Sequence, residues 1–489
     1  MSKEIKVEIN IENDKLSSFS SLHIHQQFNA HHTFELIVDH DALEQTGTHT
    51  LQKTQNLIGK FMTVCFGQKE TSDNIFKGII TEVGLAQNQG LWGSLVLKGY
   101  SPTYLLESGA HYTSFLERKL SDIVKEACSG VASNDLGLEN TPKHTEKIPY
   151  MCQYGESHFA FLNRLSEDYG EWFFYDGHHL HFGQPNEQPK VDIVYGEHLE
   201  RMHFSMRLVP SNINHYSYKS LEDELFKSPL PATVNGLDNY SQKAVEISNS
   251  LYSSPVQQPV PIRTNSKVEL DNYAEKHKER LAAGTVLLSG EGDQPKVKLG
   301  CVINVKVSQK GLGVGENEHG SYTVIRLSHQ ISGTGDYVHS FEAIPAGHKG
   351  IPSNVARPVA ESQIATVKAN DDPDNKGRVK VQMLWQQQKG LTSDWIRVMT
   401  PDAGASDKVS TNRGFVFIPE VGDQVIIGFR YNDPNRPFVL GSVFNGKTGA
   451  GGGKDNNTKT IITKGGSTII FDEAKNSITI SDPSGNTIA

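Results

Sequence analysis

The chain has 489 residues, with 47 Lys and Arg against 56 Asp and Glu, and so carries a formal net charge of −9. This length allows about three domains, and the acidic balance argues against a protein that binds nucleic acid through a strongly basic surface. The four cysteines are widely spaced and form neither a metal-binding motif nor a disulfide framework. They fit synthesis in a reducing cytoplasm.

Residues 1–105 are predicted to form a first β-barrel or sandwich built from short strands. Isoleucine and valine alternate with polar residues from Ile5 to Ile11, which is the period of a strand with one buried face. A secretory signal peptide has a continuous apolar run instead, so we expect none here. No uncharged apolar run approaches the length of about 18 residues that a membrane-spanning helix requires.

Residues 106–200 are predicted to form a small α+β insert. Ser114 starts a capping-box pattern, in which serine is followed three residues later by glutamate, and the apolar residues after it recur at helical spacing. This pattern predicts a helix over 114–128. A second helix is predicted to follow Ser157 and to end at Gly170, because glycine readily adopts the conformation that stops a helix.

Two further β regions follow the insert. Residues 201–355 are predicted to form a second barrel similar to the first, interrupted by a polar stretch around 228–265 and by a helix near 271–283. Residues 361–446 are predicted to form a compact β module, because apolar and polar residues alternate along several short segments. A glycine-rich segment, Gly446–Gly453, joins this module to the tail.

The tail from 454 to 489 repeats itself every ten residues. Asn or Gly starts each block, at Asn456, Gly466, Asn476 and Asn486. A repeat this small cannot bury its own apolar face and has to stack on a neighbour. Burial of two isoleucines in one block contributes roughly 3 to 6 kcal/mol, whereas ordering ten residues costs on the order of 15 kcal/mol.

These energies predict that the tail pairs with other copies of the chain in an intertwined oligomeric β-rod. A plain antiparallel meander within one chain remains the alternative. Because Ala489 falls inside the fourth block, we expect that the rod continues in the native protein or has been trimmed.

Two patterns of possible metal ligands have simpler interpretations. The segment Asp372–Gly377 is similar to a calcium-binding loop, but Lys376 replaces an oxygen ligand and Met383 stands where the bidentate glutamate belongs. We interpret it as a tight turn before Arg378. Two groups of histidines lack the cysteine or paired carboxylate that would complete a site, and we interpret them as solvated or hydrogen-bonded strand residues. They are His23, His25, His31, His32, His178, His179 and His181.

No nucleophile motif or phosphate-binding loop is present in the sequence. We therefore predict no catalytic residue, no cofactor and no metal site, and we expect that the chain is not an enzyme.

Three stretches of the chain carry recognisable motifs. They are Gln153–Ser157 with Phe161–Leu165 and Gly170; Val367–Val381 through Trp385 with Pro419–Val425 and Asp433–Pro437; and the repeating tail. Together they resemble the VgrG family, the spike proteins of type VI secretion and related contractile injection systems. The resemblance covers nearly the whole chain.

The resemblance implies a mainly β fold. Two hub β-barrels flank the small helical insert, 361–446 forms an oligonucleotide-binding-type (OB) barrel, and 454–489 begins an intertwined triple-stranded β-helix needle in a homotrimer. The isoleucines implied to line the three-fold axis of the needle are Ile461, Ile470, Ile478, Ile480 and Ile488. The chain departs from many relatives in its ten-residue register, and we expect no C-terminal effector domain.

The function implied is that of a trimeric tip that sits on a tube, punctures a target membrane when a sheath contracts, and carries effector proteins. Its implied partners are a hexameric Hcp-like tube protein, a PAAR-like tip protein, effectors and baseplate components. Two barrels from each of three chains would present six similar faces to the six-fold tube. Assembly in the cytoplasm and expulsion to the extracellular space or a target cell are expected.

Other functions remain open. The same architecture serves as the hub and spike of a phage-like extracellular contractile particle. A trimeric surface β-protein that binds glycans or proteins and a peptidoglycan-cleaving spike enzyme are alternatives of other classes. OB barrels also bind single-stranded nucleic acid, but 361–446 contains ten Lys or Arg and ten Asp or Glu. A net charge of zero is poor for a phosphate track, so we expect no nucleic acid.

Overall fold

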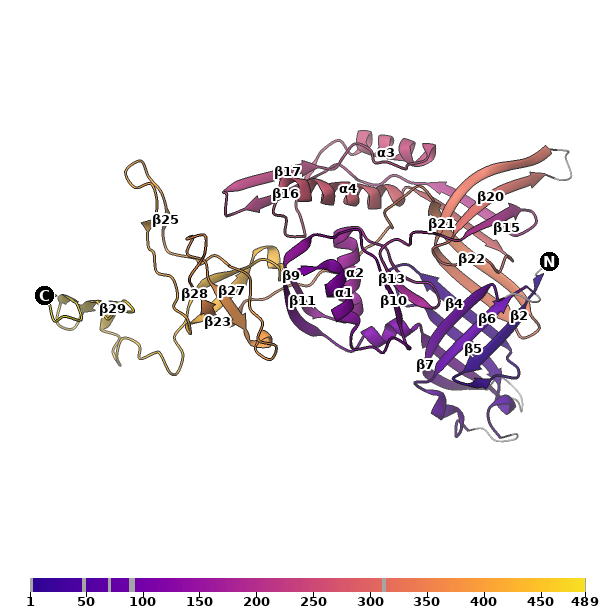
Figure 1. The fold of residues 1–489 in the computed structure, drawn as a ribbon, viewed down its shortest axis with the longest axis horizontal. Coiled ribbons are helices and arrows are strands. Elements are labelled where there is room, and N and C mark those ends of the chain that lie inside the picture. The colour runs from indigo at the N-terminus through magenta and orange to yellow at the C-terminus, as the bar shows by residue number, and fades with distance from the viewer. Residues whose placement is uncertain (1–2, 46–49, 69–71, 88–92, 310–313, 489) are drawn as a thin grey trace. The chain divides into compact units, whose positions relative to one another are not determined.

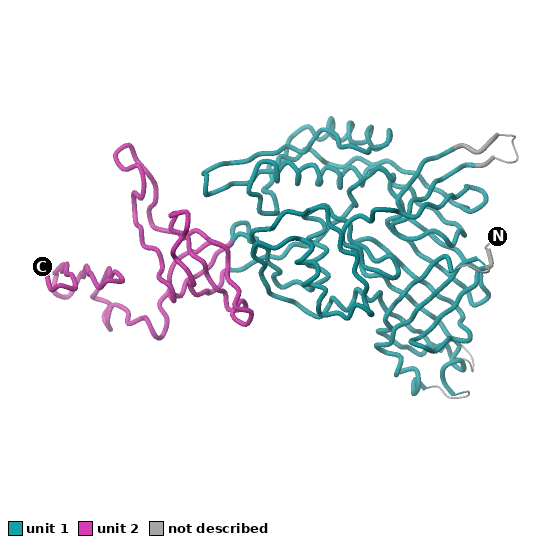
Figure 2. The backbone as a smooth tube through the Cα atoms, viewed as in Figure 1, with its two compact units in different colours: residues 1–361, 429–436 teal, residues 362–428, 437–489 magenta. Residues whose placement is uncertain are grey.

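The computed structural model describes residues 3–45, 50–68, 72–87, 93–309 and 314–488. The chain divides into two compact units (Figure 2). The first contains residues 1–361 together with 429–436, and the second contains 362–428 together with 437–489. The prediction of a mainly β fold is confirmed, because strands make up most of the regular structure in both units (Figure 1).

A first barrel is built from N-terminal strands that pair in the order β4-β5-β8-β7-β6-β2. Alternate side chains point into its core, as in β5, where Phe34, Leu36 and Val38 are buried. The strands are β2 (Lys6–Ile11), β4 (Ser21–Gln27), β5 (Thr33–Asp39), β6 (Phe61–Gly67), β7 (Asn74–Gln87) and β8 (Gly93–Tyr100), with the short β1 (Lys3–Glu4) and β3 (Asp14–Lys15) beside them.

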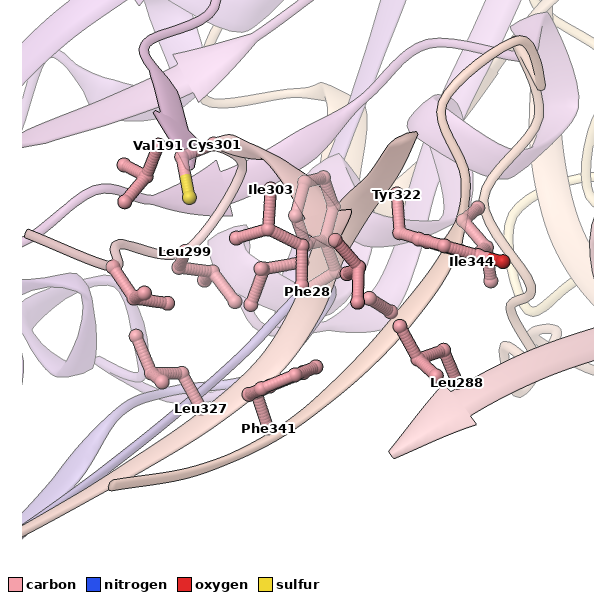
Figure 3. Packing of buried hydrophobic residues seen from close by; sticks show 14 of the residues in the cluster. Phe28, Val191, Leu288, Leu299, Cys301, Ile303, Tyr322, Leu327, Phe341 and Ile344 are labelled. Atoms are coloured by element: carbon pink, nitrogen blue, oxygen red, sulfur yellow. The ribbon is translucent and has the colours of Figure 1, made fainter. Parts of the chain in front are cut away.

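A second, six-stranded barrel closes on itself, because β21 pairs with β20 on one side and with β22 on the other. Its core includes Leu299, Ile303, Tyr322 and Phe341 (Figure 3). In order around the barrel the strands are β22 (Asp336–Pro345), β19 (Val286–Gly292), β15 (Leu199–Met206), β14 (Lys190–Tyr195), β20 (Val302–Gln309) and β21 (Val314–Ser332). Strand β14 lies within the range expected for the insert, yet it pairs in this barrel.

The long strand β21 belongs to both barrels. Its second half pairs antiparallel with β4, from Arg326 opposite Gln27 to Ser332 opposite Ser21. Ile331 therefore lies in the core of the first barrel, while the first half of the same strand pairs with β20 and β22 in the second barrel. The two barrels share one continuous hydrogen-bonded sheet, so they form one structural platform.

The two barrels also share a sequence pattern that the motif search did not detect. His32–Ile37 and His339–Ile344 both read His-x-Phe-Glu-x-Ile. The phenylalanine of each pattern lies directly opposite a glycine of the neighbouring strand, Gly99 in one barrel and Gly290 in the other. A Cβ on either glycine would come within 2.7 Å of the aromatic ring, so a larger residue at either position would displace the phenylalanine.

The insert pairs β9 (His111–Lys119) with β11 (Lys147–Glu156) and packs two helices, α1 (Leu120–Cys128) and α2 (His158–Tyr169), against a small sheet. The predicted helix over 114–128 is wrong in its first half, because 114–119 pairs with β11 as a strand. The second prediction is confirmed: the Ser157 Oγ accepts a hydrogen bond from the Ala160 N–H, and Gly170 ends α2 with a φ of 65°. The small sheet contains β10 (Gly137–Asn140), β13 (His179–Phe182) and β12 (Phe173–Tyr175).

A further layer interrupts the second barrel in sequence. The predicted helix near 271–283 is present as the end of α4 (Lys267–Ala283), whereas the polar stretch around 228–265 also contains the helix α3 (Asn239–Leu251). Three strands form the accompanying sheet: β16 (Ile213–Lys219), β17 (Glu224–Pro229) and β18 (Val256–Pro259). Within the part of the chain that the structure describes, no helix is long and apolar enough to cross a membrane.

The second unit contains the OB-type sheet, in the order β24-β23-β27-β28. Ala365, Val367, Val381, Val425 and Val439 are completely buried in its core. Its strands are β23 (Gln363–Ala369), β24 (Lys380–Met383), β27 (Gln424–Phe429) and β28 (Pro437–Ser442), with a short pair of β25 (Ala403–Gly404) and β26 (Arg413–Gly414).

The cysteines are free, and Cys128, Cys152 and Cys301 are buried. Burial raises the pKa of Cys128 to about 12 and that of Cys301 to about 11. These three thiols are therefore protonated in the folded chain at neutral pH.

The segment Asp372–Gly377 is the tight turn that the sequence predicts. The Asp372 carboxylate accepts hydrogen bonds from the backbone N–H groups of Asp374, Lys376 and Arg378. It also accepts from the Arg378 guanidinium, at 3.0 Å from Nε and 2.6 Å from Nη2. These hydrogen bonds, led by that of Arg378, hold the pKa of Asp372 well below its usual range.

We expect Asp372→Asn to destabilise the second unit by about 3 kcal/mol, because removing one partner of a buried ion pair leaves the other charge uncompensated. The lowered pKa of Asp372 stabilises the wild-type turn above the carboxyl's unfolded pKa, and this stabilisation is lost as the pH falls. Thermal unfolding measured at pH 7 and at acidic pH should show a difference between the two proteins that shrinks on acidification. Asp371→Asn, at an exposed neighbour, is the control; equal effects of the two substitutions would contradict the prediction.

Candidate assembly surfaces

The tail forms a four-stranded antiparallel meander. Its strands are β29 (Thr458–Ile462), β30 (Thr468–Asp472), β31 (Ser477–Ser481) and β32 (Thr487–Ile488), and they pair in that order. Positive φ angles of 89° at Gly466, 52° at Asn476 and 91° at Gly485 make the reversals between strands. Each ten-residue block of the sequence is therefore one strand and one turn. In the single chain the segment is the plain meander, and the intertwined needle stays a prediction.

The pairing register divides the predicted needle residues between two faces. Ile480 lies directly opposite Ile488 on β32 and opposite Ile469 on β30, which in turn lies opposite Ile461. Directly opposite residues of an antiparallel pair share a face, and Ile478 is two residues from Ile480, so it shares this face as well. Ile470 lies opposite Thr460 and Thr479 on the other face.

The apolar face of the meander is uncovered. Ile461, Ile478, Ile480 and Ile488 are 41%, 55%, 45% and 73% exposed, and Phe471 on the same face is 39% exposed. A small sheet needs packing on one face to be stable in water, and a contiguous exposed apolar surface marks an interaction site. This face is the main candidate assembly surface.

A second candidate surface lies on the two barrels, each of which carries a shallow hollow. The hollow on the first barrel has a volume of about 370 Å³ and contains the ion pair between Glu35 and Lys98, 3.1 Å apart. The hollow on the second has a volume of about 350 Å³ and contains Glu342 and Arg326, 3.0 Å apart. The two glutamates are those of the shared His-x-Phe-Glu-x-Ile pattern, so the two barrels present related chemistry.

Arg164 organises a buried polar cluster in the insert. Only 2% of this residue is exposed, and its guanidinium donates two hydrogen bonds of 2.7 Å to the carboxylate of Glu156 and one of 2.9 Å to the Cys152 carbonyl. Although burial alone would lower it, the pKa of Arg164 is raised by the hydrogen bonds and charge of Glu156. A buried arginine paired in this bidentate way can hold distant segments together.

The segment 429–436 lies against this cluster as part of the first unit, although its flanking residues belong to the second. The Asn435 Oδ1 accepts a hydrogen bond of 2.8 Å from the Cys152 N–H, and the Arg436 guanidinium donates to the carbonyls of Val260 and Ile262. Burial raises the pKa of Asp433. Cys152 and Asn435 are 283 residues apart in the sequence. Two of the sequence motifs therefore lie next to each other in the folded chain.

Several of the histidines of the sequence analysis make ordinary side-chain hydrogen bonds. His181 Nε2 lies 2.7 Å from a carboxylate oxygen of Asp176, and His31 lies within hydrogen-bond distance of Thr103 and Glu107. Among the residues that the structure describes, no group of three or more histidine, cysteine or acidic side chains is arranged to hold a metal ion.

Comparison with known proteins places these features in a family. Residues 41–335 match the family model described as the phage tail baseplate hub, and 363–444 match the type VI secretion system/phage-baseplate injector OB domain. The type VI secretion spike proteins VgrG1c and VgrG1b of Pseudomonas aeruginosa are 23% and 25% identical to the chain, over 88% and 80% of its length. The chain spans 62% and 54% of the length of these relatives.

Solved structures show the same fold. One is the structure of the E. coli c3393 protein, which is described as a component of the type VI secretion system with structural similarity to T4 phage gp27 and gp5. It has a TM-score of 0.55 at 14% identity, and the match covers 90% of this chain and 100% of that chain. Another, a Francisella PdpA–VgrG complex, has a TM-score of 0.57 at 9% identity, covering 98% and 77%.

We expect Asn435→Ala to destabilise the first unit by about 1–3 kcal/mol, because the buried Cys152 N–H loses its acceptor. Amide hydrogen exchange should also become faster at Cys152, which a nonspecific loss of stability would not single out. Asn354→Ala, at an exposed position, is the control. Unchanged exchange at Cys152 would show that Asn435 does not hold the segment 429–436 in place.

Proposed function

The chain belongs to the phage tail baseplate hub family, and from this premise we propose that it forms the homotrimeric spike of a type VI secretion or related contractile apparatus. In this role it punctures a target membrane when the sheath contracts and carries effector proteins. The order of the two matched regions, hub and then OB domain, and the VgrG names of its relatives support the proposal.

The observation that carries the proposal is the uncovered apolar face of the tail. A needle made from three copies would bury this face along a common axis and would leave the Thr, Ser and Asp side chains in water. Continuous ladders between chains would leave few free strand edges, and such a rod resists bending and unfolding under thrust. The work of puncture would come from the contracting sheath.

The needle interior is proposed to contain Ile461, Ile470, Ile478, Ile480 and Ile488. Four of these residues already share the exposed apolar face, whereas Ile470 lies on the other. The proposal therefore requires that the tail strands give up their hydrogen bonds to one another within the chain and form hydrogen bonds with the strands of other chains. A change of one residue in strand register reverses the face that each side chain occupies, so new pairing can bring Ile470 inside.

The proposed partners follow from the same architecture. A hexameric Hcp-like tube protein would bind the hub, where the related hollows of the two barrels support six similar docking faces per trimer. A PAAR-like protein would cap the needle, and effectors and baseplate components would complete the assembly. We propose neither nucleic acid nor a cofactor as a partner. Assembly would occur in the cytoplasm, before expulsion to the extracellular space or a target cell.

The role is mechanical and not enzymatic in this proposal. A hub and spike of a phage-like extracellular particle is the second candidate, because the same family models describe phage baseplates. Co-purification with a tube protein from the native host, and the genes expressed with it, would distinguish the two assemblies.

We expect the double substitution Ile478→Asp and Ile480→Asp to weaken the trimer, because it places carboxylates where each isoleucine would contribute about 1.5–3 kcal/mol by burial. Light scattering should show a lower average mass, and limited proteolysis should cut the tail sooner. Thr479→Asp adds a charge to the opposite face of the same strand and is the control. An unchanged trimer with an unchanged rate of tail cleavage would count against the needle.

The mass of the full chain should be compared directly with that of a chain ended at Gly446. We expect a trimer for the full chain and weaker association without the tail. Monomers in both samples would contradict assembly through the tail, and binding to the tube protein would then have to be tested on the hub alone.

A further inference from the structure

Two histidines and a glutamine form a buried chain of hydrogen bonds beside the β4–β21 ladder. Gln26 of β4 lies between the two rings, with its amide nitrogen 3.2 Å from His32 Nδ1 and its amide oxygen 3.2 Å from His329 Nε2. The other ring nitrogen of His329 lies 2.9 Å from the Tyr337 hydroxyl. All four residues are buried. We call this feature the Gln26 bridge.

The surroundings of the Gln26 bridge offer no partner for a positive charge. Within the described part of the chain, neither ring forms an ion pair or a hydrogen bond with a carboxylate, and His32 Nε2 has no hydrogen-bond partner. Tyr175 and Phe76 pack against the His32 ring, and Phe66 packs against the His329 ring. A charge buried in such surroundings is costly unless it is paired.

The titratable groups nearest the two rings are mostly other histidines. Burial lowers the pKa of both His32 and His329 to about 3. A charge on His25 of β4 or on His31 would lower the pKa of His32 further. A charge on His339 of β22, which lies directly opposite His329, would do the same to that ring. Each proton that enters this region therefore makes the next one harder to accommodate.

The acidic groups nearby do not reverse this balance. The Asp176 charge and the Gln27 carbonyl raise the pKa of His32, but burial outweighs both. The Asp176 carboxylate is already bonded to His181, at 2.7 Å. Burial and then the charge of Asp293 raise the pKa of Tyr337, so the tyrosine hydroxyl keeps its proton.

One carboxamide cannot serve two charged rings. An imidazolium donates at both nitrogens, whereas a neutral imidazole accepts at one of them. Gln26 presents its oxygen to one ring and its N–H to the other in either orientation of the amide, so at least one ring has to accept. If both rings were charged, two donors would meet inside the barrel. The hydrogen bond lost in this way leaves a buried group unsatisfied.

We propose that the Gln26 bridge is a pH-sensitive switch on the ladder between β4 and β21: as His32 and His329 take up protons, the bridge breaks and the two strands separate. The two barrels then come apart at the strand that they share. This inference goes beyond the proposed spike function and does not rest on it, because it concerns the response of the folded hub to acid.

The direction of the pH dependence follows from the lowered pKa values. An exposed histidine has a pKa of about 6.5, whereas both rings of the closed bridge have a pKa of about 3. The stability that they contribute is complete above about pH 6.5 and is lost as the pH falls toward 3. The ladder should therefore open in mildly acidic solution and close again on neutralisation.

Amide hydrogen exchange of the full chain tests the switch. Between about pH 6 and pH 4, the opening constant of the β4–β21 amides should rise about 100-fold per pH unit, because opening takes up two protons. The rates are corrected for the intrinsic pH dependence of exchange. The amides between β14 and β20, in the second barrel, should stay protected over the same range. Equal loss of protection in the two ladders would show unfolding of the whole unit and would overturn the proposal.

Two variants assign the protons. His32→Asn and His329→Gln each replace a ring with an amide that can form hydrogen bonds but does not titrate. In each variant the opening constant should rise only about tenfold per pH unit, whatever the substitution does to stability at neutral pH. His178→Gln, at an exposed position, is the control and should keep the wild-type dependence. A rise that stays at about 100-fold in either bridge variant would overturn the proposal, because the protons would then bind elsewhere.

Discussion

The antiparallel ladder between β21 and β4 is the constraint on which the first unit depends. A strand that belongs to two barrels fixes the register of both, because a slip of one residue would turn every buried side chain of β21 outward. Tyr337 and His329 show how closely the two halves are matched: the tyrosine hydroxyl lies 2.9 Å from one histidine nitrogen, and Gln26 of β4 lies 3.2 Å from the other. Burial lowers the pKa of His329 to about 3, so this buried histidine carries no charge at neutral pH.

In the insert, buried charged side chains form a network of ion pairs and hydrogen bonds. Arg164 gathers Glu156 and the Cys152 carbonyl, and Asp168 interacts with Arg164 at 3.6 Å and with Arg357 at 2.7 Å. Replacing such a network with apolar residues would often cost little stability, so its value lies in specifying one arrangement. Here the arrangement includes the segment 429–436, which returns from the OB-type sequence to the first unit. The polar cluster thus explains why the two most distinctive sequence motifs, far apart in the chain, occur together.

Local signals in the sequence were sufficient where local interactions decide the structure. Ser157 and Gly170 cap α2 with their own side chain and backbone, and Asp372 closes its turn with groups no more than six residues away. The capping-box pattern at Ser114 failed because pairing of β9 with β11 provides more hydrogen bonds than another helical turn would. The sequence did not predict helix α3, because the small polar residues Ser241 and Ser248 occupy its buried side and interrupt the apolar pattern. The ten-residue period predicted the tail strands, but it could not place Ile470, because each antiparallel reversal changes which residues face one another.

The buried thiols determine how the folded chain responds to oxidants. A thiolate, not a thiol, reacts with oxidants and disulfides, and the raised pKa values of Cys128, Cys152 and Cys301 keep that form scarce. None of these sulfurs is bonded to another, so the fold gains nothing from oxidation and loses nothing without it. At neutral pH these three buried thiols therefore react slowly with oxidants and disulfides, whereas Cys65 is only partly buried.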